Sequence, residues 1–148
     1  MSQSLRQELH SALTAVVAEM QQCVGQLLQA LESERMALDG NDTEALNHAG
    51  SQKQQVLLRL ERLDTERLQF QKELDTPSTT LESAWSAVMQ SLHRCQQLNL
   101  RNGTVVNQRL LQVRNALAVL TGHSGESKLY GRTGELRANA RSQVLAEA

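Results

Sequence analysis

Apolar residues recur at intervals of three and four along almost the whole chain up to Gly122. In the first segment they fall at Leu9, Leu13, Val16, Met20, Val24, Leu27 and Leu31. Such steps place side chains on one face of an α-helix, and a sustained alternation of threes and fours is typical of helices in a bundle or coiled coil. This feature predicts an all-α protein.

The composition favours the same fold class. Aromatic residues make up only 2% of the 148 residues, there is no isoleucine, and Pro77 is the one proline. β-Sheets rely on β-branched and aromatic side chains, and a proline inside a helix breaks it. We therefore expect no sheet, and long helices before Pro77.

Breaks in the apolar pattern divide the chain into three long helices, expected at about residues 4–38, 43–74 and 79–121. Turn-forming residues separate the segments, and Gly122 suits the left-handed position after a helix end. Short connections make neighbouring helices antiparallel, so residues 1–122 should form an up-down-up bundle that resembles a coiled coil.

Beyond Gly122 the chain changes in character. Residues 123–148 contain glycines, scattered charges and few large apolar side chains. This segment has too little apolar surface to offset the entropy lost on ordering, so we expect a flexible tail that binds a partner. Leu136, Ala140 and Val144 lie four apart, which predicts a weak, partly helical segment within the tail.

Charge and cysteine content exclude several classes of function. The 15 basic and 16 acidic residues give a net charge of −1, so the chain has no overall field that attracts nucleic acid. No apolar run approaches the roughly 20 residues of a membrane span, and the N-terminal residues do not resemble a signal peptide. Cys23 and Cys95 are too few for a disulfide framework and fall on the apolar stripes, where cysteine acts as a small hydrophobe. We expect a cytoplasmic protein without direct membrane insertion.

The sequence contains no pattern that indicates catalysis, a metal or a cofactor. His93 and Cys95 are two residues apart, so they do not share a helix face, and a structural zinc ion needs four ligands. There is no glycine-rich phosphate loop and no GxSxG motif. We therefore expect a protein that is not an enzyme.

The arginines of the third helix have a simple explanation. They are Arg94, Arg101, Arg109 and Arg114. Their spacing scatters them around the helix and no aromatic residues lie between them, which favours a solvated surface over a nucleic-acid-binding face.

A few polar or small residues interrupt the apolar stripes. Asn99 and Asn102 lie at polar seam positions, where such residues set the register of a coiled coil. The long cations Lys53 and Arg67 are expected to reach water from the edge of the bundle. Gly103 lies in mid-helix at a cost of about 1 kcal/mol relative to alanine, which a close helix approach or a local bend would explain.

Several short patterns follow one another in a particular order. They are Glu34, Leu38, Asp42, Leu46, Lys53, Leu57 and Leu60 around the first helix junction, then Trp85, then Leu98-Asn99-x-x-Asn102-Gly103, and then Tyr130-Gly131-x-x-Gly134. In this order and spacing the chain resembles the FlgN family, whose members are cytoplasmic export chaperones for the flagellar hook-associated proteins FlgK and FlgL. The resemblance covers nearly the whole chain and is weakest over residues 135–148.

The resemblance implies a client and a second partner. A FlgN-like chaperone would bind the C-terminal helical segment of FlgK or FlgL, prevent its premature assembly, and bring it to the inner-membrane flagellar export apparatus. The client region that carries over is the later part of the third helix, where we expect contact through Val106, Leu110, Val113, Leu117 and Leu120. Tyr130 matches the family tyrosine that docks on the export gate protein FlhA.

Two other interpretations remain open. The chain could be a self-assembling coiled-coil structural subunit, because axial proteins are also helical and rich in glutamine and alanine. It could also be a helical adaptor of another secretion system. The first interpretation predicts concentration-dependent polymers, whereas a chaperone should show weak self-association at most.

Overall fold

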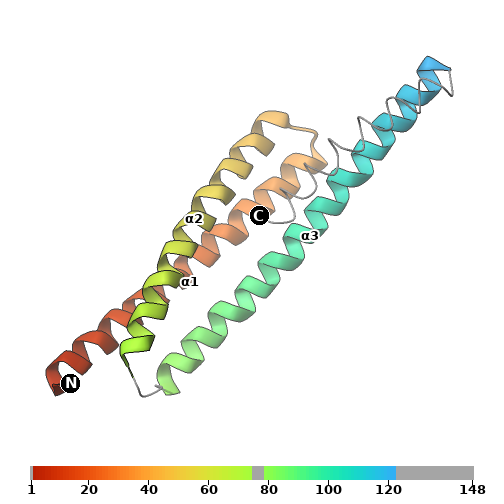
Figure 1. Cartoon of the computed structure of the whole chain (residues 1–148). Helices are drawn as coiled ribbons and strands as arrows, with labels where there is room; N and C mark the ends of the chain where they lie inside the picture. Colours follow the sequence, from red (N-terminus) through yellow and green to blue (C-terminus); the bar gives the residue numbers. More distant parts are fainter. Residues whose placement is uncertain (1, 75–78, 123–148) are drawn as a thin grey trace.

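The computed structural model describes residues 2–74 and 79–122, and they form three long helices with no strand (Figure 1). Helix α1 spans Gln3–Asp39, α2 spans Thr43–Glu73 and α3 spans Thr79–Thr121. The prediction of an all-α bundle of three long helices is confirmed, and the expected helix bounds differ from the observed ones by at most one residue. The tail expected at residues 123–148 lies outside the described residues.

The turn between α1 and α2 is built from residues with turn-forming chemistry. Asn41 has a φ of 52°, in the left-handed region that asparagine tolerates better than most residues. Asp42 then caps α2, because its Oδ1 accepts a hydrogen bond from the backbone N–H of Ala45 at 3.0 Å. The backbone N–H of Asp42 also donates to the carbonyl of Ala37 at 2.9 Å, which closes the turn. Helices α1 and α2 therefore lie antiparallel (Figure 1).

The core is centred on α1. This helix packs against both α2 and α3, whereas no described Cα atom of α2 lies within 8 Å of one in α3. The buried core cluster consists of Val16, Val17, Met20, Cys23, Val24, Leu27 and Leu31 from α1, Leu60 and Leu63 from α2, and Val88, Cys95 and Leu98 from α3. The predicted apolar stripes of all three helices thus meet around α1.

Helix α3 is longer than the other two and continues past the α1–α2 turn (Figure 1). The level of the turn is marked by Arg109, whose Nη1 donates a hydrogen bond to Oδ1 of Asn41 at 2.6 Å. From there to Thr121 the helix extends by about 18 Å, at 1.5 Å per residue. It ends at Gly122, whose φ of 64° suits a left-handed helix C-terminus.

The structure gives a different account of Gly103 from the one expected. A Cβ atom added at this position would meet nothing within 4 Å. The expectation of a close helix approach at Gly103 is therefore wrong.

Candidate functional site

Residues 110–121, the part of α3 beyond Arg109, form the α3 extension. The apolar stripe predicted for partner contact runs onto it. Val106 and Leu110 are half-buried, whereas Val113, Leu117 and Leu120 are 56%, 49% and 82% exposed. The stripe therefore passes from the bundle onto an accessible helix surface.

Exposed apolar side chains are concentrated on the α3 extension. Five of the eleven large apolar residues that are exposed in the described chain lie there, and two of them, Leu111 and Val119, lie off the stripe. Helices α1 and α2 end or begin at the turn beside Arg109, so neither continues alongside the extension (Figure 1). Clustered apolar exposure of this kind marks an interaction site more often than it marks ordinary surface.

A buried polar cluster links all three helices within the bundle. It consists of Glu34 on α1, Lys53 on α2, and Asn99 and Asn102 on α3. Nζ of Lys53 lies 3.0 Å from Oε2 of Glu34, and it donates a hydrogen bond to Oδ1 of Asn99 at 3.1 Å. Nδ2 of Asn102 donates to Oε1 of Glu34 at 2.9 Å and to the Leu31 carbonyl at 3.0 Å.

The position of Lys53 corrects an expectation. Its side chain is 3% exposed, so it does not reach water from the edge of the bundle. The Glu34 carboxylate and the Asn99 amide oxygen compensate its charge inside the protein, which a buried cation requires. Because the bonds cross between helices, the cluster is suited to fixing their relative register.

The spacing of the α1 stripe also marks Glu34 as an inward-facing residue, although spacing alone does not show which residue it contacts. Leu27 and Leu31 belong to the α1 stripe, and Glu34 occupies its next position. An acidic residue and a lysine that both occupy stripe positions, on consecutive helices, are candidates for a buried ion pair.

Arg67 and Trp85 form a second link between α2 and α3. The guanidinium of Arg67 lies 3.9 Å from the centroid of the Trp85 ring, a cation–π arrangement. The same side chain donates to Oδ1 of Asp64 at 2.9 Å and to Oε1 of Gln71 at 2.8 Å. Arg67 is 14% exposed and packs over the tryptophan, so the expectation that it extends into water is also wrong.

Both cysteines are free thiols in the core. Sγ of Cys95 lies 3.9 Å from the carbonyl oxygen of Val24. Burial raises the pKa of the Cys95 thiol from the ordinary 9.0 to about 11, although the neighbouring Arg94 charge lowers the pKa. Cys95 is therefore a protonated packing residue at neutral pH, not a reactive thiolate.

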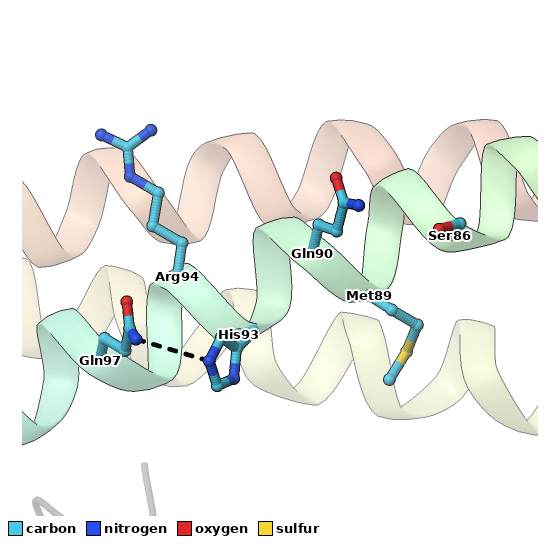
Figure 2. Close-up of a pocket in the computed structure, with 6 residues that line it drawn as sticks. All are labelled: Ser86, Met89, Gln90, His93, Arg94 and Gln97. Carbon is cyan, nitrogen blue, oxygen red and sulfur yellow. Dashed lines mark hydrogen bonds between the residues drawn. The ribbon is translucent and has the colours of Figure 1, made fainter.

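An open hollow lies on one face of α3 (Figure 2). The described residues that line it are Ser86, Met89, Gln90, His93, Arg94 and Gln97. Figure 2 shows that their side chains leave a single helix in different directions, with one contact of 3.4 Å between Nε2 of Gln97 and Nε2 of His93. Polar groups that diverge in this way do not make a reaction centre.

The part of the chain that the structure describes contains neither a metal-binding cluster nor a membrane-spanning helix. No three His, Cys, Asp or Glu side chains there are grouped to hold a metal ion. None of the described helices is long and apolar enough to span a membrane.

Comparison with known proteins identifies the family. The family model described as FlgN protein matches residues 1–138, which include all three helices and Tyr130. No curated protein and no solved structure gives a significant match. The match confirms the resemblance based on the helix junction, Trp85 and the two glycine-containing motifs. Since it covers almost the whole sequence, the chain belongs to the FlgN family, which consists of flagellar export chaperones and not of enzymes.

Proposed function

We propose that this chaperone binds the C-terminal helical region of FlgK and FlgL, prevents their premature assembly, and delivers them to the export gate protein FlhA. The observation that carries the proposal is the apolar stripe that continues onto the exposed α3 extension. Family membership supports the general role of a flagellar export chaperone. The extension supplies a surface on which a client could lie.

The proposed binding mode is helix against helix. An amphipathic client helix would lay its apolar face along Val113, Leu117 and Leu120, which are all about half or more exposed in the free chain. Fully burying an aliphatic side chain contributes about 1.5–3 kcal/mol, so these residues together could hold a client. Covering the client's apolar face would also block its association with other subunits.

Delivery would involve a second contact. Tyr130 lies outside the described residues but within the matched family region, and we propose that it docks on FlhA. The chaperone would then act in the cytoplasm and meet the inner-membrane export apparatus only transiently.

The client site can be tested with two leucines that differ only in their helix face. Leu117 lies on the stripe and is 49% exposed, whereas Leu111 is 50% exposed and lies about 120° around the helix. Leu117→Lys places an unpaired charge in the contact and should weaken FlgK and FlgL binding by about 30-fold, or about 2 kcal/mol. Leu111→Lys should leave the affinity almost unchanged. Isothermal titration calorimetry with the purified clients measures both.

Both variants should keep the thermal stability of the parent chain, because neither leucine is part of the buried core. Equal losses of affinity in the two variants would mean that the stripe is not the contact face. Unchanged affinity in Leu117→Lys would place the client elsewhere on the chaperone.

The role of Tyr130 can be separated from client binding. Tyr130→Ala removes one anchoring aromatic ring, which typically costs about 2 kcal/mol or more at a binding hot spot. We expect the variant to lose affinity for the cytoplasmic domain of FlhA and to retain its affinity for FlgK and FlgL. Binding measurements on one preparation test both partners, and comparable losses for both would mean that Tyr130 belongs to the client site.

A self-assembling structural subunit is a second candidate function. An exposed apolar stripe with steps of three and four residues can also pair with the same stripe on a second copy of the chain. It predicts polymers whose size grows with concentration. Analytical ultracentrifugation of the purified chain separates the two, since a chaperone should sediment as a small discrete species.

A further inference from the structure

We infer that the helix bound by the α3 extension carries acidic residues beside its apolar stripe, where they face Arg109 and Arg114. This inference rests on the proposed function and adds the chemical class of the client segment.

Charge is strongly segregated in α3. Glu82 is its last acidic residue, and the sequence from Ser83 to Gly122 contains no aspartate or glutamate. The same stretch contains the four arginines Arg94, Arg101, Arg109 and Arg114. Because the whole chain has a net charge of −1, this basic character is a local property of α3.

Two of these arginines flank the stripe on the extension. Arg109 precedes Leu110 by one residue, and Arg114 follows Val113 by one residue. If Leu110 and Leu117 occupy the a positions of a heptad, Arg109 falls at g and Arg114 at e. These positions border the apolar seam of paired helices, and their charges select the partner.

The other two arginines provide a natural contrast. Arg101 lies nine residues before Leu110, so it projects from the opposite side of the helix. Arg94 and Arg101 are both exposed, whereas Arg109 and Arg114 are half-buried beside the stripe. Only the second pair is placed to act on a helix that covers the stripe.

Arg109 is also held in place. Its Nη1 donates to the Asn41 side chain at the α1–α2 turn, and that amide oxygen is uncharged. The bond orients the guanidinium without cancelling its charge. A carboxylate of the partner would gain a charge-assisted hydrogen bond to a group that is already ordered.

The same charges disfavour a second copy of this chain as the occupant. In a parallel pair, g and e positions of opposite chains meet, which would place Arg109 against Arg114 twice. In an antiparallel pair g faces g and e faces e, so a register that centres the two extensions on one another places Arg114 against its copy. Like charges at these positions oppose pairing of two copies. A helix with carboxylates at the facing positions would instead attract both arginines.

An anionic membrane is a less suitable partner. Helices that lie on membranes carry lysine or arginine across their polar face. On the extension, the polar residues that face away from the stripe include Gln112 and Asn115, which are neutral. Two arginines beside an apolar seam fit a helix partner better than a lipid surface.

The test uses two synthetic 21-residue helical peptides with leucine at every a and d position. One has glutamate at all e and g positions and the other has lysine, so each repels its own copies equally. We expect the full chain to bind the glutamate peptide about tenfold more tightly at low ionic strength, and this preference should shrink as salt screens the charges. Fluorescence anisotropy measures both affinities.

Charge-reversed variants locate the effect. Arg109→Glu combined with Arg114→Glu should invert the preference, whereas Arg94→Glu combined with Arg101→Glu should leave it intact. If the first double variant loses thermal stability, Arg114→Glu alone should still remove most of the preference, and its melting temperature shows whether the fold is intact.

Several results would overturn the inference. Equal binding of both peptides is one, and an equal effect of the two double variants is another. Stripe-dependent dimers that neither peptide disrupts would indicate a second copy, and binding to phosphatidylglycerol vesicles without peptide binding would indicate a membrane.

If purified FlgK and FlgL bind the parent and Arg109→Glu/Arg114→Glu equally, only this inference fails. If neither client binds the parent chain, the proposed function fails as well.

Discussion

Lys53 is a cation buried in the bundle, and groups from α1 and α3 hold it there. Its ion pair with Glu34 at 3.0 Å is supported by Asn99 and Asn102. Breaking a buried pair by removing one partner is costly because the other charge remains without compensation. The cluster should therefore show strong energetic coupling at the scale of single residues.

We predict that Lys53→Met lowers the free energy of unfolding by about 3 kcal/mol, because it leaves the Glu34 carboxylate buried without its cation. The double variant Glu34→Leu/Lys53→Met removes both charges, so its free energy of unfolding should fall by much less. Urea unfolding followed by circular dichroism measures both, and together with Glu34→Leu alone it completes a double-mutant cycle. A double variant as unstable as the sum of its two single variants would show that the pair is not coupled.

The sequence predicted the location of these residues better than their interactions. Spacing alone places Lys53, Asn99 and Asn102 on the apolar stripes, and therefore inside a bundle. Which of them pair depends on the relative register of three helices, and periodicity along one helix contains no information on that register. The ion pair therefore became visible only in the structure.

At the scale of elements, α3 consists of two parts with different surroundings. Val88, Cys95 and Leu98 pack in the core, whereas most side chains of the extension are exposed. The sequence predicted the ends of α3 correctly, since Gly122 provides the expected left-handed C-terminus. It did not indicate where the neighbouring helices stop beside α3, because the apolar stripe continues without a break through that point.

Gly103 lies between these two parts and gives a prediction about α3. Its backbone is helical and a Cβ atom there would have open space, so alanine should fit without strain. We expect Gly103→Ala to raise the free energy of unfolding by about 0.5–1 kcal/mol, because glycine loses more backbone entropy in a helix. Thermal and urea denaturation measure the gain.

Gly122→Ala provides the contrast, since its φ of 64° strains any residue with a Cβ atom. Gly122→Ala should therefore give no gain in the free energy of unfolding. A loss of stability in Gly103→Ala would mean that this glycine serves a conformation other than a regular helix.

At the scale of the whole molecule, the architecture separates stability from recognition. The core lies around α1, and the stripe proposed for client binding runs onto the α3 extension. In Figure 1 this part of α3 continues past the α1–α2 turn. A surface placed outside the core can remain apolar and exposed without weakening the fold. Substitutions on the extension should therefore change binding, and substitutions around α1 should change stability.

Hydrogen–deuterium exchange of the chain, alone and in complex with FlgK, tests the central claim most directly. In the free chain, amides of residues 110–121 should exchange quickly, because neither α1 nor α2 runs beside this part of α3 and most of its side chains are exposed, and those of residues 16–31 should exchange slowly. Binding of FlgK should slow exchange over residues 106–121 and leave residues 16–31 unchanged. Protection that appears on α1 and α2 while residues 106–121 continue to exchange as in the free chain would contradict the account.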